Sequence, residues 1–176
     1  SNSYTNFTSL PKFQIKVDDK LVRGRAVTCP YNLYKMKNEG ITQVIDLRNS
    51  SFVRRPLERF FCKILGLKYF NFKYPHRLNK LPEESFFEKI NKTILNNDGK
   101  TYIHCQYGKR RTGISVAIYE KLHCKKSKSE VLEHLLNYGF QEIRDNKNTS
   151  KRIKLQSIYD DFIQKYFNIN LYKKKP

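Results

Sequence analysis

Strand-like and helix-like segments alternate along this sequence, and the alternation limits the possible folds more than any other feature. Three short runs have the β-branched and aromatic residues typical of strands: ITQVIDLR at 41–48, KYFNF at 68–72 and TYIHC at 101–105. The segments between them carry apolar residues at helical spacing. This order predicts an α/β fold in which helices flank a mainly parallel central sheet.

The remaining segments extend the same pattern toward both ends of the chain. The runs FQIKV at 13–17 and LVRGRAV at 21–27 flank a DDK turn and predict an N-terminal hairpin. Proline, serine and glycine signals mark the ends of helices. The expected helices cover residues 28–40, a segment that starts at Pro56, residues 82–97, residues 109–123, a segment that starts at a Ser127–Glu130 capping box, and residues 150–167.

Three of these helices have an apolar pattern that can be followed residue by residue. The helix at 109–123 is apolar around much of its girth and is expected to be central. In the helix that starts at Pro56, the apolar residues at helical spacing are Leu57, Phe60, Phe61, Ile64 and Leu65. In the last helix, the residues expected to face the core are Leu155, Ile158, Phe162 and Tyr166.

The length of 176 residues, with 39% hydrophobic, suits one domain with a single core. We expect a loose segment at 1–10, one domain at 11–170, a basic tail at 171–176, and a monomer. No apolar run approaches the roughly 20 residues of a membrane span, and no signal peptide opens the sequence. These features predict a cytoplasmic, intracellular protein and leave attachment to a membrane surface open.

The chain is strongly basic, with 35 Lys and Arg against 16 Asp and Glu and a formal net charge of +19. Such a charge favours polyanionic partners, namely a phosphorylated substrate, an anionic membrane surface or, as the least favoured of the three, nucleic acid. A solvated basic surface is the alternative. The clusters KKSK at 125–128 and KKK at 173–175 could contact anionic lipid or simply carry solvated charge.

Four cysteines, Cys29, Cys62, Cys105 and Cys124, are too widely spaced for a C-x-x-C motif, and no histidine cluster completes a zinc site. We therefore expect no metal, no cofactor and a reducing compartment. Cys62 or Cys124 could form a protective disulfide with Cys105 under oxidation. The alternative is that both are ordinary core or surface thiols.

The segment TYIHCQYGKRRTG at 101–113 combines a thiol with three adjacent cations where a strand passes into a helix. The backbone N–H groups of such a loop can form an anion cup, and the helix N-terminus adds partial positive charge. Gly108 permits an unusual backbone conformation, and the guanidinium of Arg111 can hold two phosphate oxygens. The same field lowers the pKa of Cys105, which makes it a candidate nucleophile for phosphoryl transfer.

Neighbouring residues of this segment are assigned supporting roles. His104 could hold the loop through its ring hydrogen bonds, and Thr112 could donate its hydroxyl to the sulfur. Gly113 allows the helix to pack closely on the sheet. The loop residues expected to contact substrate are Gln106, Tyr107, Gly108, Lys109 and Arg110.

The string HCQYGKRRTG resembles the signature of the protein-tyrosine-phosphatase superfamily, in its compact dual-specificity branch. The upstream segments LVRGRAV, GITQVIDLR and GLKYFNFKYP are similar to strands of atypical, bacterial or fungal members, and the likeness covers residues 20–140. The resemblance implies the family fold, a two-step reaction through a phosphocysteine, and no metal. It places the nucleophile on Cys105, the phosphate-binding arginine on Arg111 and the hydroxyl on Thr112.

The sequence departs from the family at the general acid, because no aspartate stands in FNFKYPHRLNKLPEESF, where the family carries one. His76 is the first candidate for a replacement, since imidazole titrates near neutral pH. Glu83 and Glu84 are further candidates, although acids there also suit the start of a helix. A reaction without a side-chain acid is the third alternative. Asp46 is expected to support the end of its strand, together with Arg48.

More cations surround the expected site than one phosphate monoester needs. Lys73, Arg77 and Lys80 lie in the facing loop, and Arg54 and Arg55 are expected at its border. The excess favours a multiply phosphorylated substrate, such as a phosphoinositide or an inositol polyphosphate. A phosphotyrosine protein, RNA or another polyanion, and a binding module that has lost turnover remain as alternatives.

Overall fold

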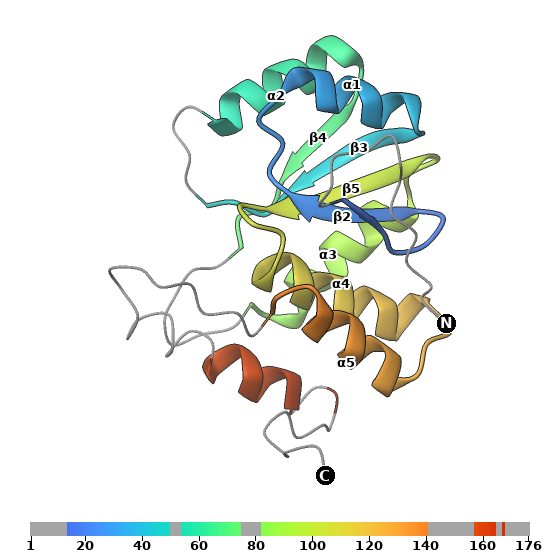
Figure 1. Ribbon diagram of the computed structural model, residues 1–176, viewed down its shortest axis with the longest axis vertical. Coiled ribbons are helices and arrows are strands. Elements are labelled where there is room, and N and C mark those ends of the chain that lie inside the picture. The colour runs from blue at the N-terminus through green and yellow to red at the C-terminus, as the bar shows by residue number, and fades with distance from the viewer. Residues whose placement is uncertain (1–13, 50–53, 75–81, 141–156, 165–166, 168–176) are drawn as a thin grey trace.

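A five-stranded sheet lies at the centre of the computed structural model, which describes residues 14–49, 54–74, 82–140, 157–164 and 167 (Figure 1). The strand order is β1-β2-β5-β3-β4, with β1 antiparallel to β2 and the other pairs parallel. The N-terminal hairpin and the mainly parallel α/β sheet are therefore confirmed. The strands are β1 (Ile15–Lys16), β2 (Leu21–Arg25), β3 (Ile41–Asp46), β4 (Lys68–Asn71) and β5 (Lys100–Cys105).

Helices cover both faces of this sheet, as Figure 1 shows. On one face lie α1 (Pro30–Asn38) and α2 (Arg54–Leu65), and on the other lie α3 (Glu84–Leu95), α4 (Arg110–His123) and α5 (Lys128–Asn137). The sequence signals set several of these ends. Pro30 stands in the first turn of α1, where its missing N–H costs nothing. The predicted capping box of α5 is confirmed, with Ser127 and Glu130 each bonded to the other's backbone N–H.

Alternating side chains of the strands build two separate cores. Ile45 and Ile103 point toward α3, α4 and α5, where they join buried residues such as Ile90. Val44 and Tyr102 point to the opposite face and pack with α1 and α2. The helix α4 is buried from Thr112 to Glu120, which confirms the prediction that this helix is central.

The last expected helix packs on a different face from the one predicted. Residues 157–164 are helical, and the buried positions are Tyr159, Asp160, Ile163 and Phe167, whereas Ile158 and Phe162 are half-buried. The inward face is thus rotated by about one residue from the prediction, because Tyr159 packs on Tyr74 and Phe140. Leu155 and Tyr166, also expected inward, lie outside the residues whose side chains are described.

The helix α2 begins at Arg54, two residues before the proline that was expected to start it. A proline fits there because the N–H groups of the first turn need no partner within the helix. Its burial pattern is unusual: Glu58 and Cys62 are buried, whereas Leu57, Phe60 and Ile64 are exposed. Leu57, Phe60 and Ile64 therefore point to solvent, whereas Phe61 and Leu65 are half-buried and pack against the core on this side of the sheet.

Some predictions fall outside the described residues, among them the loose segment at 1–10, the basic tail at 171–176 and the first part of the helix at 150–167. Within the described ranges, no helix has the length and apolar character needed to cross a membrane.

The core on the α3 side gives a test of this packing. Replacing the buried Ile90 with alanine should lower the free energy of unfolding by about 2–5 kcal/mol, because methyl groups are lost from a filled core. Leu95→Ala in the same helix is the matched control, since Leu95 is exposed and should cost less than about 1 kcal/mol. Urea unfolding of both variants measures the difference, and equal losses would contradict the assigned core.

Candidate active site

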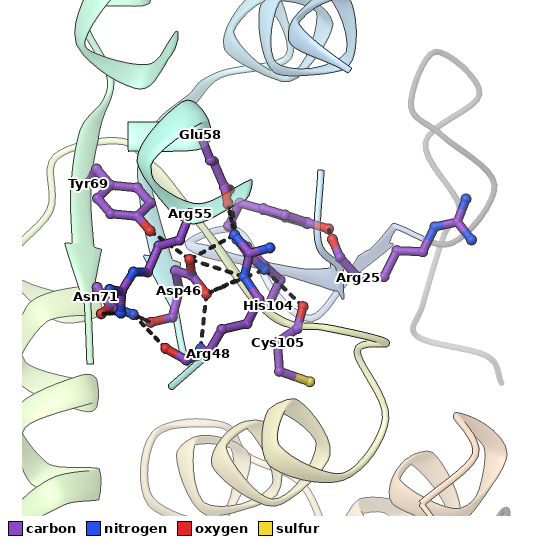
Figure 2. A network of polar contacts seen from close by, with 10 residues as sticks. Arg25, Asp46, Arg48, Arg55, Glu58, Tyr69, Asn71, His104 and Cys105 are labelled. Atoms are coloured by element: carbon purple, nitrogen blue, oxygen red, sulfur yellow. Dashed lines mark hydrogen bonds and ion pairs between the residues drawn. The ribbon is translucent and has the colours of Figure 1, made fainter. Parts of the chain in front are cut away.

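The thiol of Cys105 lies at the carboxyl end of β5, the strand between β2 and β3. Its register partner in β2 is Arg25, and the partner of the preceding His104 in β3 is Asp46. Ligands of parallel α/β sheets bind beyond these strand ends. In Figure 2 the side chain of Cys105 points away from the charged network formed by its neighbours.

The loop after Cys105 is held against β2. Gly108 has a φ of +70°, which disfavours other residues. A Cβ atom there would lie 2.4 Å from the carbonyl oxygen of Gly24, a backbone atom that cannot easily move. The buried Arg23 donates from Nη2 to the carbonyl oxygen of Gly108 at 2.9 Å. The adjacent residues Arg23 and Gly24 therefore fix the back of the loop.

The surroundings of Cys105 favour its thiolate form. Burial alone would raise its pKa, but the charge of Arg111 opposes this effect, together with hydrogen bonds from Thr112 and from the backbone of Gly108. The balance lowers the pKa of Cys105 below its ordinary value. The site therefore brings Cys105 and Arg111 together, as the sequence predicted.

Thr112 is buried in the first turn of α4, directly after Arg111. Its hydroxyl has no hydrogen bond of good geometry among the described residues, yet it lowers the pKa of Cys105. We take this hydroxyl to be oriented toward the sulfur without being fully bonded to it. A group in this position can donate to the thiolate as negative charge develops there.

A buried charged network supports His104 (Figure 2). Its Nε2 atom lies 2.7 Å from Oε1 of Glu58, and its Nδ1 atom lies 3.0 Å from the carbonyl oxygen of Cys105. Burial would lower the pKa of His104, but Glu58 and then Asp46 outweigh it and raise the pKa to about 9. His104 is therefore a cation at neutral pH that donates from both ring nitrogens.

Arg48 joins the two carboxylates of this network. It donates to Asp46 Oδ2 at 2.9 Å and to Glu58 Oε2 at 2.6 Å. Tyr69 also donates to Asp46 at 2.6 Å. Burial would raise the pKa of Asp46, but His104 and Arg48 hold it below its ordinary value. The predicted pairing of Asp46 with Arg48 is present, and both side chains are buried.

Three side chains of the network could in principle surround a metal ion. The ligand atoms of Asp46, Glu58 and His104 lie within 4.8 Å of one another. However, Arg48 already bonds to both carboxylates, and a protonated imidazole has no lone pair for a metal. The donor set therefore fits an ion-pair network and does not fit a metal centre.

Two buried phenols lie beside the loop. The charge of Arg111 and that of Cys105 both act on the pKa values of Tyr74 and Tyr159, and the two rings pack edge to face with centroids 6.2 Å apart. Burial raises the pKa of Tyr159 to about 12, so the phenol stays neutral at physiological pH. These rings form an apolar wall near the anion cup.

The pKa values of Cys62 and Cys124 differ from that of Cys105. Burial, followed by the charges of Glu58 and Asp46, raises the pKa of Cys62 to about 12. Burial and the charge of Asp18 raise that of Cys124 to about 12 as well. Both thiols are protonated near neutral pH, which favours their interpretation as ordinary thiols.

Of the candidates for the general acid, the structure describes Glu83 and Glu84 but not His76. His76 lies outside the described residues, as do Arg77 and Lys80. Glu83 is the N-cap residue of α3 and Glu84 is its first helical residue, which agrees with the helix-start alternative.

The additional cations are spread around the site. Lys73 is exposed in the segment that follows β4, and Arg55 donates to Asn71 Oδ1 at 2.9 Å, whereas the side chain of Arg54 is not described. Lys109 is the N-cap residue of α4, and Arg110 follows it. A cavity of about 270 Å³ flanks the loop, and its lining includes Arg25, Gln106 and Tyr107.

Sequence reasoning missed Glu58 and Arg23, which act on the loop from other elements. Glu58 stands in a helix whose other charged residues are all basic, and Arg23 stands inside a strand of buried residues. A charged residue in an otherwise buried pattern was the available signal. Their partners lie 46 and 85 positions away, so the spacing could not reveal them.

No family model matches this chain, and no curated protein matches it. Several solved structures, however, match this chain. The core catalytic domain of the PP-IP phosphatase SIW14 from S. cerevisiae, bound to citrate, has a TM-score of 0.63 and 18% identity over 85% of this chain and 95% of its own. P. aeruginosa TpbA in complex with pTyr has a TM-score of 0.65 and 11% identity over 96% and 98%.

A putative phosphatase from Shewanella putrefaciens has a TM-score of 0.60 and 13% identity over 88% of this chain and 92% of its own. At these identities the likeness shows the fold. The described structure is therefore the mixed α/β fold shared by phosphatases of the protein-tyrosine-phosphatase type, which agrees with the resemblance seen in the sequence.

The raised pKa of His104 predicts how stability depends on pH. His104 titrates near 9 in the folded protein and near 6.5 when unfolded, so its contribution is complete below pH 6.5 and is lost as pH rises through 9. The contribution of Cys105 to the free energy of unfolding changes with pH in the opposite direction, because its pKa is lowered in the folded protein, and it would mask the effect of His104. The test therefore uses Cys105→Ser, whose free energy of unfolding should fall by on the order of 1–3 kcal/mol over that range.

Adding Glu58→Gln removes the largest favourable influence on His104 and should flatten this pH dependence. Lys92→Gln, on the exposed surface of α3, is the control and should leave the slope unchanged. Urea unfolding from about pH 6 to pH 9 provides the measurement. If the free energy of unfolding falls equally steeply with pH after Glu58→Gln, the contact with Glu58 does not raise the pKa of His104.

Proposed function

We propose that this protein is a cysteine-dependent phosphatase that hydrolyses phosphate esters through a phosphocysteine intermediate. The observation that carries the proposal is the buried thiol of Cys105, whose pKa is lowered by Arg111 and by the amides of a loop at the N-terminus of α4. An isolated structural thiol would show the raised pKa of Cys62. The shared fold of known phosphatases supports the same reading.

The reaction would proceed in two displacements. The thiolate of Cys105 attacks phosphorus, the sulfur–phosphorus bond forms, and the bond to the leaving oxygen breaks. The loop amides and Arg111 hold the three non-bridging oxygens, on which charge is carried during transfer. Water then attacks the phosphocysteine and releases inorganic phosphate, while the Thr112 hydroxyl stabilises the departing thiolate.

The leaving oxygen of the first step must gain a proton unless it is already a good leaving group. His76, Glu83 and Glu84 are the candidates, and a reaction without a side-chain acid is the alternative. Replacing each candidate by a neutral residue and comparing alkyl with aryl phosphates separates these cases. Only loss of the true acid should impair alkyl phosphates selectively.

We further propose that the substrate carries several phosphates, as in a phosphoinositide or an inositol polyphosphate. Lys109 and Arg110 stand in the loop next to Arg111, and Arg25 lines the cavity on its flank with Gln106 and Tyr107. These cations could bind phosphates other than the one transferred. The fold shared with SIW14, a PP-IP phosphatase, supports this substrate class.

A phosphotyrosine protein is the second candidate substrate. The observation in its favour is the similar fold of TpbA, whose structure contains pTyr. The exposed Tyr107 at the mouth of the loop could pack against an aromatic phosphoester. A phosphatase without turnover, which only binds phosphate, is disfavoured by the presence of both Cys105 and Arg111.

Replacing the nucleophile tests the proposed mechanism. Cys105→Ser should reduce turnover of p-nitrophenyl phosphate by about 10³-fold or more and still bind phosphate, because the anion cup remains. Arg111→Lys keeps the charge but loses the two-pronged contact and should lower kcat/KM by on the order of 10²-fold. Phosphate release and isothermal titration with vanadate measure these effects.

Cys62→Ser is the matched control, because Cys62 is a buried thiol of α2 that lies outside the loop. It should retain most of the activity. Full activity of Cys105→Ser would exclude the phosphocysteine mechanism, and loss of wild-type activity in EDTA would point to a metal-dependent enzyme.

Salt dependence tests the substrate class. Raising salt to about 0.5 M should lower kcat/KM about tenfold for an inositol polyphosphate and less than about threefold for p-nitrophenyl phosphate, because the partly exposed Lys109 and Arg110 are screened more than the buried thiol and Gly108 of the cup. Lys109→Gln with Arg110→Gln should remove this difference. Lys92→Gln with Lys128→Gln, two exposed lysines on other helices, is the control pair. Equal salt responses of both substrates, or a strong preference for phosphotyrosine peptides, would contradict the polyphosphate assignment.

A further inference from the structure

The layer formed by α1 and α2 exposes large apolar side chains that the site does not use. The loop of Cys105 lies beyond the end of β5, and the inward sides of α1 and α2 pack in the core that contains Leu33, Met36 and Cys62. The exposed fractions are 60% for Tyr31, 49% for Tyr34, 48% for Leu57, 55% for Phe60 and 64% for Ile64. We call these five residues the α1–α2 apolar surface.

The α1–α2 apolar surface is formed by several side chains that pack on their neighbours. Tyr31 and Tyr34 stack with ring centroids 6.4 Å apart, and Phe60 packs edge to face on Phe61 at 5.7 Å. A cavity of about 330 Å³ between the two helices has Leu33, Leu57 and Phe61 in its lining. Exposed apolar groups of this extent on a folded domain usually mark a contact with a partner or a membrane.

The charges on the same helices limit the kind of partner. Within the bounds of α1 and α2, the one carboxylate in the sequence is Glu58, and it is buried against Arg48 and His104. All remaining charged residues are basic: Lys35, Lys37, Arg54, Arg55, Arg59 and Lys63. The exposed side chains within the two helices therefore combine apolar groups with cations, and the half-buried Glu39 adds one carboxylate at the C-terminal end of α1.

An anionic lipid bilayer matches this combination. Aromatic and aliphatic side chains can enter the boundary between headgroups and acyl chains, while Lys and Arg contact anionic headgroups. Nucleic acid would account for the cations but not for the exposed Leu57 and Ile64. A second copy of the chain would bring further cations against those already present, which opposes association.

The position of α2 relative to the site agrees with this partner. The helix follows β3, so its N-terminal end lies at the edge of the sheet where the strands end and Cys105 stands (Figure 1). Arg55 in its first turn bonds to Asn71 at the end of β4. Binding along α2 would therefore keep the loop of Cys105 near the membrane surface.

We propose that the α1–α2 apolar surface, with its flanking lysines and arginines, is a docking site for anionic membranes. The docking is peripheral, with the side chains of Leu57, Phe60 and Ile64 inserted at the interface. It concerns a surface outside the catalytic loop and does not depend on turnover.

Sedimentation with vesicles tests this proposal. The full chain should bind vesicles of phosphatidylcholine with about 30% phosphatidylserine, and bind phosphatidylcholine alone much more weakly, because the cations need anionic headgroups. Phe60→Ser with Ile64→Ser should weaken binding about tenfold or more, since two inserted side chains are lost. Arg59→Gln with Lys63→Gln, which keeps the apolar groups, should weaken it by a similar factor and reduce its salt dependence.

Matched pairs elsewhere on the molecule are the controls. Leu95→Ser with Leu122→Ser removes exposed leucines from α3 and α4, and Lys89→Gln with Lys92→Gln removes exposed cations from α3. Both control pairs should bind vesicles as the wild type does. Hydrolysis of soluble p-nitrophenyl phosphate should be unchanged in every pair, which separates lipid docking from the proposed catalysis.

Three results would overturn the proposal. The first is equal binding of the wild type to neutral and anionic vesicles, or no binding to either. The second is a loss of binding in the control pairs that matches the loss in the α1–α2 pairs. The third is a wild-type dimer that Phe60→Ser with Ile64→Ser converts to a monomer without changing vesicle binding, which would assign the surface to a second copy of the chain.

Discussion

The buried contact between His104 and Glu58 holds the backbone from which the thiol of Cys105 projects. His104 directly precedes the thiol, and its ring bonds at 2.7 Å to Glu58 and at 3.0 Å to the carbonyl oxygen of Cys105. A ring held at both nitrogens cannot rotate, and the carbonyl it binds is kept away from the anion cup. The N–H groups of the loop are then left to face a bound anion.

The charges behind the loop also balance one another. Asp46 and Glu58 are paired with Arg48 and the protonated His104, so the network contributes little net charge to the site. The pKa of Cys105 is therefore set by its burial, by Arg111 and by the loop itself. Burial of these pairs carries a desolvation cost, and the fixed position of the nucleophile is the benefit that we infer from it.

The loop also depends on β2, which lies next to β5 in the sheet although some 80 positions separate them along the chain. Because Gly108 has no side chain, its turn can approach the carbonyl group of Gly24, and Arg23 binds the carbonyl of that turn. The back of the anion cup is thus built by the N-terminal hairpin. A strand for which the sequence predicted no role in the site contributes directly to the geometry of the site.

The sequence by itself determined the alternation of strands and helices, the capping box of α5, and the grouping of Cys105 with Arg111, because each follows from neighbours along the chain. The tertiary structure decided the roles of Glu58 and Arg23 and turned Leu57, Phe60 and Ile64 of α2 toward solvent, since these depend on contacts between distant segments. Helical spacing gives the period of an apolar face but not its direction. In α2 the buried ion pair of Glu58 with His104 and Arg48 fixed that direction, and local sequence contains no information about such a partner.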